Sequence, residues 1–283
     1  MINIAIIGAT GRMGRMVMEA MATDEQVRLV GALVSPSSSL LGQDSGLVVL
    51  NQANHIPFSH ELNQLLAHGV TIDGGNGETL FPDVLIDFST LDGALRTATL
   101  CAQSHTPLVM GVTGFDHQAQ DRLNTTARHA AYLQAANFSL GVNLALQLTE
   151  KMAAALPDFY DIEILEMHHH HKVDAPSGTA LALGRQAALG RKIDHDEKAV
   201  LSREGQVGRR EQGSIGYATL RGGDVVGEHD VIFASQGERI TLSHKASSRM
   251  IFAKGALYAA KWLADKPAGY YSMAQVLNLG ETG

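Results

Sequence analysis

The sequence has 283 residues, 45% of them hydrophobic, and a formal net charge of −7. This length is enough for a buried core in one large or two ordinary domains. The net negative charge excludes bulk attraction to nucleic acid or anionic lipid. No apolar run approaches the roughly 18 residues of a membrane span. The single cysteine, Cys101, cannot form an internal disulfide, so we expect a reducing, cytoplasmic setting. The first residues lack the basic start and the cleavage site of a signal peptide.

The first third of the chain predicts a βαβ unit. Residues 2–7 (INIAII) form an apolar, β-branched run that ends in glycine, which is typical of a buried parallel strand. A second such strand is expected at residues 27–34. Between them, apolar side chains recur at helical spacing, and we interpret this stripe as core packing. Its members are Met13, Met16, Val17, Ala20 and Met21.

Strands and helices continue to alternate up to about residue 138, which predicts a parallel sheet with helices on both faces. The expected strands are residues 83–89, 107–111 and 132–136. The signal is weaker from residue 47 to residue 81, where residues 73–78 indicate a turn. The final strong helix, residues 247–264, is expected to pack on this first domain.

After Val142 the pattern changes to sequential strands with few helices, which indicates a mostly antiparallel sheet. The expected strands are residues 160–171, 215–222, 225–235 and 239–246, with a helix over residues 179–189. The predicted fold is therefore α/β, with a Rossmann-like dinucleotide-binding domain (residues 1–138 and 248–283). An inserted α+β domain with a mostly antiparallel sheet (residues 139–247) interrupts it.

A glycine loop follows the first strand and opens the first helix. Gly8, Gly11 and Gly14 have the spacing G-x-x-G-x-x-G, in the context that a pyrophosphate-binding loop requires. The N–H groups and the dipole of the helix N-terminus favour an anion there, and Arg12 is placed to reach a phosphate. A purely structural turn is the alternative. Two later loops at strand ends, residues 111–115 and 135–139, are expected to line the nicotinamide half of the dinucleotide.

Residues 166–181 read EMHHHHKVDAPSGTAL, with five consecutive basic side chains in mid-chain. A metal site, a proton-transfer site, an anion-binding patch and chance are the alternatives. On a strand, His168 and His170 point to one face and the other two histidines point to the opposite face, so no metal site is expected. Histidine titrates near neutrality, lysine supplies charge or an acid, and Ser177, Gly178 and Thr179 offer hydroxyls and N–H groups to a carboxylate. These properties favour a site for proton transfer and anion binding.

The segment EMHHHHKVDAPSGTAL resembles the signature of the dihydrodipicolinate (4-hydroxy-tetrahydrodipicolinate) reductase family. GATGRMG, DVLIDFST, GVTGF, AANFSLGVN, SREG, IGYATLRGGDVVGEH and HKASSRMIFAKGA also match the family in order, over nearly the whole chain. The resemblance implies a cytoplasmic homotetramer of lysine and diaminopimelate biosynthesis. Such an enzyme transfers a hydride from NADPH or NADH to a cyclic imine-type dicarboxylate. The inserted domain would bind this small substrate and mediate oligomerisation, with no nucleic-acid or membrane partner.

The resemblance also implies roles for individual residues. His168 corresponds to the catalytic histidine and Lys172 to the proton donor, while Arg249 corresponds to a residue that assists a carboxylate or the domain interface. The implied substrate-carboxylate ligands are His169, Gly178 and Thr179. The implied dinucleotide ligands are Gly8, Ala9, Thr10, Gly11, Arg12 and Met13, together with Gly111, Val112, Thr113, Ala135, Ala136, Asn137 and Phe138 at the nicotinamide end.

One position departs from the family pattern. Val34 stands where the family often has an acid that binds the ribose hydroxyls, and Ser35 stands where some members carry arginine. Both NADPH and NADH therefore remain candidate cofactors, and we expect NADPH to be used at least as well. A related two-domain enzyme, such as an aspartate or homoserine dehydrogenase, explains the glycine loop but not the histidine run. A nucleotide-sensing protein without catalysis is the third alternative.

Overall fold

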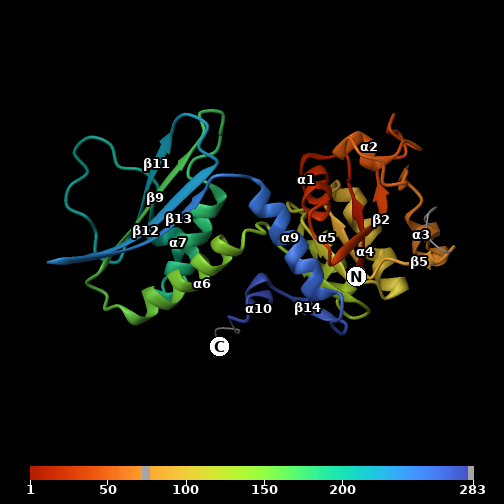
Figure 1. Cartoon of the computed structure of the whole chain (residues 1–283). Helices are drawn as coiled ribbons and strands as arrows, with labels where there is room; N and C mark the ends of the chain where they lie inside the picture. The colour runs from red at the N-terminus through yellow and green to blue at the C-terminus, as the bar shows by residue number, and fades with distance from the viewer. Residues whose placement is uncertain (72–76, 280–283) are drawn as a thin grey trace. The chain divides into compact units, whose positions relative to one another are not determined.

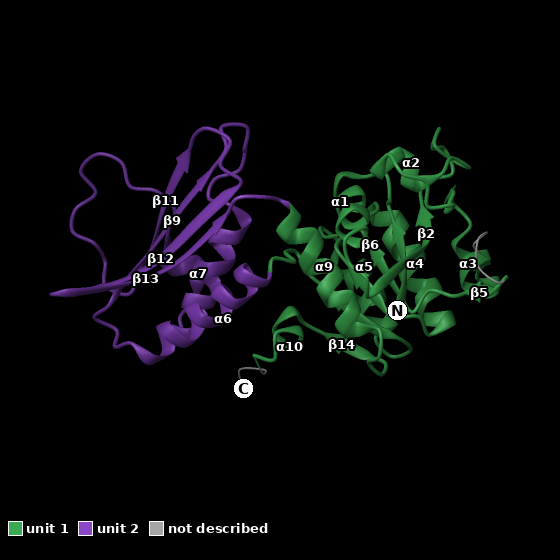
Figure 2. Ribbon diagram, in the orientation of Figure 1, with its two compact units in different colours: residues 1–139, 250–283 green, residues 140–249 purple. Residues whose placement is uncertain are grey.

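A computed structural model describes residues 1–71 and 77–279 of the chain. The turn predicted at residues 73–78 falls mostly outside these residues. The chain divides into two compact units, residues 1–139 with 250–283 and residues 140–249 (Figure 2). Each unit has its own sheet and its own hydrophobic core. No helix in the described part of the chain is long and apolar enough to cross a membrane.

Unit 1, which contains residues 1–139 and 250–283, is built on a parallel sheet (Figure 1). In its described residues the strand order is β14-β8-β7-β6-β1-β2-β3, and every pairing is parallel. The chain first builds outward from β1 to β2 and β3, and then crosses to β6 on the other side. The carboxyl ends of β1 and β6 therefore form the switch point at which such sheets bind ligands. The strands are β1 Ile2–Ile7, β2 Val27–Leu33, β3 Phe58–Ser59, β6 Val84–Asp87, β7 Leu108–Met110, β8 Ala131–Gln134 and β14 Gly269–Tyr271.

Helices cover this sheet, because its central strands are mostly apolar and must be buried on both faces. All four residues of β6 are buried. The helix predicted near the C-terminus is α9, and it packs on α1 and on strands β6, β7 and β8. The helices of unit 1 are α1 Arg12–Met21, α2 Ser45–Leu50, α3 Leu62–His68, α4 Leu91–Ser104, α5 His117–Thr126, α9 Met250–Leu263 and α10 Met273–Val276. A small antiparallel pair, β4 Val70–Thr71 and β5 Thr79–Leu80, completes the unit.

Unit 2, residues 140–249, has a five-stranded sheet in the order β10-β11-β9-β12-β13. The sheet is mixed, since β12 is antiparallel to both of its neighbours whereas β9, β11 and β10 run parallel. Helices α6 and α7 pack against each other and α7 also packs on β9, β11 and β12. The strands are β9 Asp161–His168, β10 Ala199–Val200, β11 Ile215–Arg221, β12 Gly227–Ser235 and β13 Glu238–Ala246. The helices are α6 Leu140–Ala155, α7 Gly178–Arg191 and α8 His195–Lys198.

The end of β9 differs from the sequence prediction, which extended this strand to residue 171. The strand ends at His168, and the next residues turn. The N–H of His169 donates to the carbonyl of Val225, and the N–H of Lys172 donates back to the carbonyl of His169. The expected alternation of the four histidines is therefore wrong beyond His168. The rings of His170 and His171 lie side by side, with centroids 3.8 Å apart.

Candidate active site

The glycine loop approaches its neighbours too closely for any side chain. Gly8 has a φ of +78°, and a Cβ on it would lie 2.7 Å from the carbonyl oxygen of Phe88. A Cβ on Gly14 would collide with the carbonyl oxygen of Gly8, because the first turn of α1 packs directly on the loop. Glycine at these two positions lets the loop turn back over the end of β1 and leaves its backbone open to a ligand.

The loop opens onto a cavity of about 580 Å³ at the carboxyl ends of β1, β2 and β6. Three of the predicted dinucleotide ligands line this cavity, namely Gly8, Thr10 and Gly11. Ala9 is fully buried beneath it, while Arg12 and Met13 begin α1 and do not line it. Val34 and Ser35, which the sequence comparison placed near the ribose, also line the cavity. A glycine loop that lines a cavity at the N-terminus of a helix fits a dinucleotide phosphate group.

An acidic side chain lines this cavity, from a part of the chain where the sequence predicted no ligand-binding residue. Glu61, the N-cap residue of α3, lines the cavity beside His60. The Nε2 atom of His60 lies 2.8 Å from the Glu61 carboxylate. Arg96 on α4 lines the same cavity. The region between residues 47 and 81 has little periodicity, so only the folded structure brings these side chains to the cavity.

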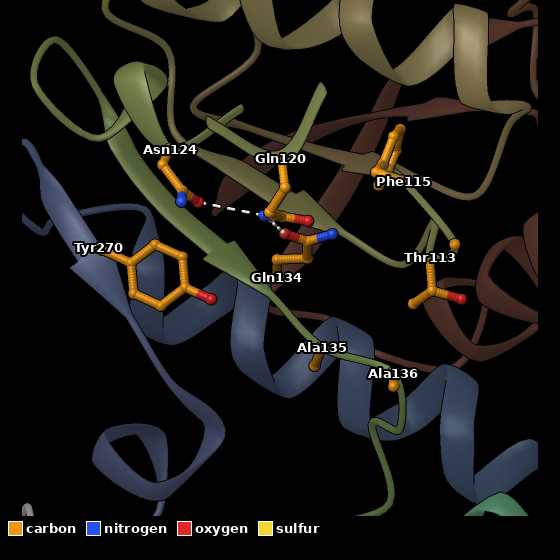
Figure 3. A pocket seen from close by; sticks show the side chains of 9 residues that line it. Thr113, Phe115, Gln120, Asn124, Gln134, Ala135, Ala136 and Tyr270 are labelled. Atoms are coloured by element: carbon orange, nitrogen blue, oxygen red, sulfur yellow. Dashed lines mark hydrogen bonds between the residues drawn. The ribbon is translucent and has the colours of Figure 1, made fainter. Parts of the chain in front are cut away.

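The two other predicted loops meet at a second cavity of unit 1, of about 720 Å³ (Figure 3). Thr113 lines it from the loop after β7, and Ala135 and Ala136 line it from the end of β8. Gly111, Val112, Asn137 and Phe138 do not line it. Phe138 is buried instead and packs edge-on against Phe88, with ring centroids 5.7 Å apart. A Cβ on Gly111 would overlap the Phe88 ring, so this glycine allows the close packing of the loop.

An amide network joins the elements around this second cavity. Figure 3 shows Gln120, Asn124 and Gln134 close together, and Gln120 Nε2 donates to the side-chain oxygens of the other two at 3.1 and 2.6 Å. Gln134 Nε2 in turn donates to the carbonyl of Val112 at 3.2 Å. The network therefore ties the loop after β7 to the end of β8 and to α5. It offers an uncharged, polar wall to a ligand.

Unit 2 carries the histidine run, and its centre is a buried carboxylate. Glu166 on β9 is only 1% exposed. Its Oε2 accepts a hydrogen bond from His168 Nδ1 at 2.6 Å, and Arg221 binds both of its oxygens at 2.8 and 2.9 Å. Burial by itself would raise the pKa of Glu166, but the hydrogen bonds from Arg221 and His168 outweigh it and hold the pKa below its ordinary value. The Glu166 carboxylate is therefore ionised at neutral pH.

Lys172 lies one turn beyond the strand, with its side chain mostly covered. Its Nζ donates to both carboxylate oxygens of Asp174, at 2.8 and 2.9 Å. This ion pair lowers the pKa of Asp174. The Lys172 side chain is 20% exposed and that of Asp174 is 55% exposed. The ammonium group is thus held in an ion pair with a half-exposed carboxylate of the same loop.

The start of α7 is held by the same group of residues. Ser177 is the N-cap, and its hydroxyl accepts from the N–H of Ala180 at 3.1 Å while its own N–H donates to Glu166 at 3.0 Å. His229 on β12 contacts the Ser177 hydroxyl through Nε2 at 2.9 Å. Gly178 is exposed, and a Cβ there would meet only open space. The first turn of α7 is therefore open to an anion at Gly178.

His169 is paired with Arg249 at the end of unit 2. Arg249 Nη2 donates to His169 Nε2 at 3.2 Å. Burial, together with the charge of Arg249, lowers the pKa of His169. A neutral ring that accepts at Nε2 carries its hydrogen on Nδ1, and this buried atom has no hydrogen-bond partner among the described residues. His169 therefore keeps a buried N–H donor that a carboxylate oxygen can reach only if the side chains around it move.

Five predicted residues of unit 2 lie in one short stretch of the sequence, namely His168, His169, Lys172, Gly178 and Thr179. The sequence analysis predicted no role for Arg221 or His229. It also predicted none for Glu166, although this residue lies inside the recognised motif. Arg221 and His229 lie more than 50 residues further along, and only the pairing of β9 with β11 and β12 brings them close. In the described part of the chain, no group of three or more histidine, cysteine, aspartate or glutamate side chains could hold a metal ion.

Known proteins resemble both units. A family model described as the N-terminus of dihydrodipicolinate reductase matches residues 2–138, and the model of its C-terminus matches residues 141–277. Proteins named 4-hydroxy-tetrahydrodipicolinate reductase from Ruegeria pomeroyi and Cupriavidus metallidurans are 45% and 46% identical to this chain over 277 residues. Both alignments cover 98% of this chain, and they cover 98% and 99% of the two relatives.

A solved structure shows the same fold. A dipicolinate-bound dihydrodipicolinate reductase from Paenisporosarcina sp. TG-14 matches with a TM-score of 0.75 at 24% identity, over 97% of this chain and 98% of that protein. The two family models together span nearly all of the chain, in the order that the sequence motifs predicted. The chain belongs to the dihydrodipicolinate reductase family.

Proposed function

We propose that the chain reduces 4-hydroxy-tetrahydrodipicolinate to tetrahydrodipicolinate with a reduced pyridine nucleotide, in lysine and diaminopimelate biosynthesis. Family membership supports the activity, and one observation supports the site. In unit 2, the proton-bearing side chains of His168 and Lys172 lie in the same short segment as the open start of α7. This combination suits a substrate that needs both a proton and two carboxylate ligands.

The chemistry assigns a role to each of these side chains. The bound nucleotide supplies a hydride. The 4-hydroxyl of the substrate leaves as water, which gives the conjugated imine. Hydride addition to this imine leaves negative charge on the substrate, and Lys172 or His168 supplies the proton that quenches it. His169 and the N–H groups at Gly178 and Thr179 hold the substrate carboxylates, and Arg249 orients His169. In unit 1 the loop backbone from Gly8 to Gly11 holds the pyrophosphate, and the loops at residues 111–113 and 135–138 hold the nicotinamide end.

For the cofactor, we infer that NADPH is used at least as well as NADH. Val34 can neither accept hydrogen bonds from the ribose hydroxyls nor repel a 2′-phosphate. Ser35 and Arg96 line the same cavity and supply hydrogen-bond donors. Glu61 is the acidic side chain that lines this cavity and favours NADH, although one of its oxygens lies 2.8 Å from His60. The donors and the missing acid at residue 34 together favour the phosphorylated nucleotide.

We also infer that the protein is a cytoplasmic homotetramer that assembles through unit 2. On the strands β9 and β12 the residues facing away from α6 and α7 are only partly exposed, and they include Leu165, Met167 and Ile232. Leu220 on β11 is 48% exposed beside them. A group of apolar side chains on a sheet face without a covering helix is typical of a protein interface. We expect Ile232→Glu to lower the molar mass measured by light scattering, and a monomeric wild-type protein would contradict the assembly.

The activity is tested by following the absorbance of NADPH and NADH with freshly made product of dihydrodipicolinate synthase. We expect turnover with this substrate and none with aspartate semialdehyde, or with oxaloacetate and ammonia. Turnover of either of the latter in place of the former would identify a homoserine or aspartate dehydrogenase. Nucleotide binding without turnover of any of them would identify a sensor.

A further inference from the structure

We propose that Glu166 is a positioning residue of the reductase site, which with Arg221 fixes both the ring of His168 and the start of α7. This inference rests on the proposed function, since it acts through His168 and through the residues that bind the substrate carboxylates. Glu166 itself is too deeply buried to contact substrate, at 1% exposure.

The hydrogen bonds of Glu166 leave it no capacity for other chemistry. Oε2 accepts from His168 and Arg221, and Oε1 accepts from the second Arg221 nitrogen. Oε1 also accepts from the N–H of Ser177 and from the hydroxyl of Thr219, at 3.0 and 3.3 Å. A carboxylate has about four lone-pair sites, so these bonds saturate it. A saturated, ionised carboxylate orients its donors and does not exchange protons with them.

The first of these donors is the ring of His168. Because an ionised carboxylate can only accept, Nδ1 of His168 carries a hydrogen, and in the neutral ring Nε2 is the free lone pair. Among the described residues no hydrogen bond involves this Nε2. Two neighbours restrict the ring further: His229 packs edge-on at a centroid distance of 5.0 Å, and a Cβ on Gly227 would lie 2.9 Å from Nε2. The ring therefore has one orientation and one tautomer.

The second donor is the first turn of α7. The N–H of Ser177 binds Glu166, and the Ser177 hydroxyl caps the helix that continues into Gly178 and Thr179. Arg221 adds a hydrogen bond to the carbonyl of Asp174, so it also holds the loop that leads to this helix. One ion pair thus sets the distance between the proton-transfer ring and the carboxylate-binding turn. A displacement of about 1 Å in such a geometry can cost about 100-fold in rate.

The test compares a single variant with a double variant. Glu166→Leu leaves the Arg221 guanidinium without its partner and is expected to unfold at a lower temperature. Glu166→Leu combined with Arg221→Met removes both charges and is expected to recover most of the thermal midpoint. If Glu166 is a positioning residue, kcat of the double variant stays about 100-fold below wild type, while the KM for the nucleotide is unchanged. Recovery of kcat together with stability would show a merely structural ion pair and would overturn the proposal.

A second readout needs no turnover. The ring signals of His168 are those that disappear from the nitrogen-15 spectrum in His168→Gln. In the wild-type protein these signals should show the hydrogen on Nδ1. The double variant should show a mixture of both tautomers. The matched control is Glu163→Gln, on the opposite face of β9, whose carboxylate binds Arg203 and Arg210. It should leave the His168 signals in place.

A wild-type ring protonated on Nε2, or an unchanged tautomer in the double variant, would contradict the positioning role. A wild-type protein that shows the expected tautomer but does not reduce the substrate would instead contradict the proposed function. The two failures are therefore distinguishable.

Discussion

The Nε2 atom of His229 lies 2.9 Å from the hydroxyl of Ser177 and so joins β12 to the residue that caps α7. The imidazole is only 5% exposed. Burial, with a smaller effect from the nearby His168 ring, lowers the pKa of His229 from 6.5 to about 4. The ring is therefore neutral in the folded protein over a range in which it is protonated in the unfolded chain.

This shift predicts a loss of stability in mild acid. Between pH 6.5 and pH 4 the unfolded state binds one proton more at His229 than the folded state does, so the free energy of unfolding falls as the pH falls. From pH 7.5 to pH 5 this one group contributes a loss of about 2 kcal/mol. Urea unfolding at the two pH values should show this loss in wild type and in the control His170→Gln, and a smaller loss in His229→Gln. An equal loss in all three proteins would contradict the assignment.

We expect Lys172→Ala and His168→Ala to act mainly on kcat. Loss of a positioned acid typically costs about 10²–10⁴-fold in rate, and neither residue is expected to contact the nucleotide phosphates. The change in the KM for the nucleotide should be small. Lys198→Ala is the matched control, because Lys198 forms a similar ion pair with Glu211 in the same unit. Near-normal turnover in both His168→Ala and Lys172→Ala would refute their role in proton transfer.

The ribose end of the first cavity predicts the nucleotide preference. One hydrogen bond to the 2′-phosphate is worth about 1.5–3 kcal/mol, and 1.4 kcal/mol is tenfold in kcat/KM. Val34→Glu adds a carboxylate beside the ribose, so it should shift the ratio of kcat/KM for the two nucleotides toward NADH. Glu61→Gln should shift the ratio the opposite way, because Glu61 lines the same cavity. A wild-type preference for NADH of tenfold or more would refute the inference, as would an unmoved ratio in Val34→Glu.

We predict that activity requires no metal ion. In the described part of the chain, no three histidine, cysteine, aspartate or glutamate side chains converge on one point, and His168 is bound to Glu166. The measurement is kcat after exhaustive chelation and dialysis, beside the metal content of the purified protein. A stoichiometric metal whose removal abolishes activity, and whose return restores it, would contradict this prediction. Weak binding of nickel or zinc to the histidine run would not contradict it.

Sequence reasoning succeeded where local pattern determines structure. The run INIAII followed by Gly8, Gly11 and Gly14 predicted a strand, a turn and a helix, and the structure has β1, a positive φ at Gly8 and α1 there. It failed at the end of β9, because the turn after His168 is fixed by carbonyls of residues 223 and 225, which no local pattern reveals. It missed Arg221 and Glu61 for the same reason. Arginine and glutamate are common on protein surfaces, so nothing in the sequence marks these two. Strand pairing brings Arg221 to its site, and a loop brings Glu61 to its cavity.

The binding of a dicarboxylate by residues 168–179 is tested most directly by calorimetric titration with pyridine-2,6-dicarboxylate (dipicolinate) and with pyridine-2-carboxylate. We expect the dicarboxylate to bind at least about tenfold more tightly, since a hydrogen bond to a charged group is worth about 1.5–3 kcal/mol. His169→Ala should lose most of this difference. His170→Ala, whose exposed ring lies in the same run and bonds the carbonyl of Gly223, should keep it. Equal affinity for the two ligands in wild type, or a selectivity that survives His169→Ala, would contradict this assignment of the site.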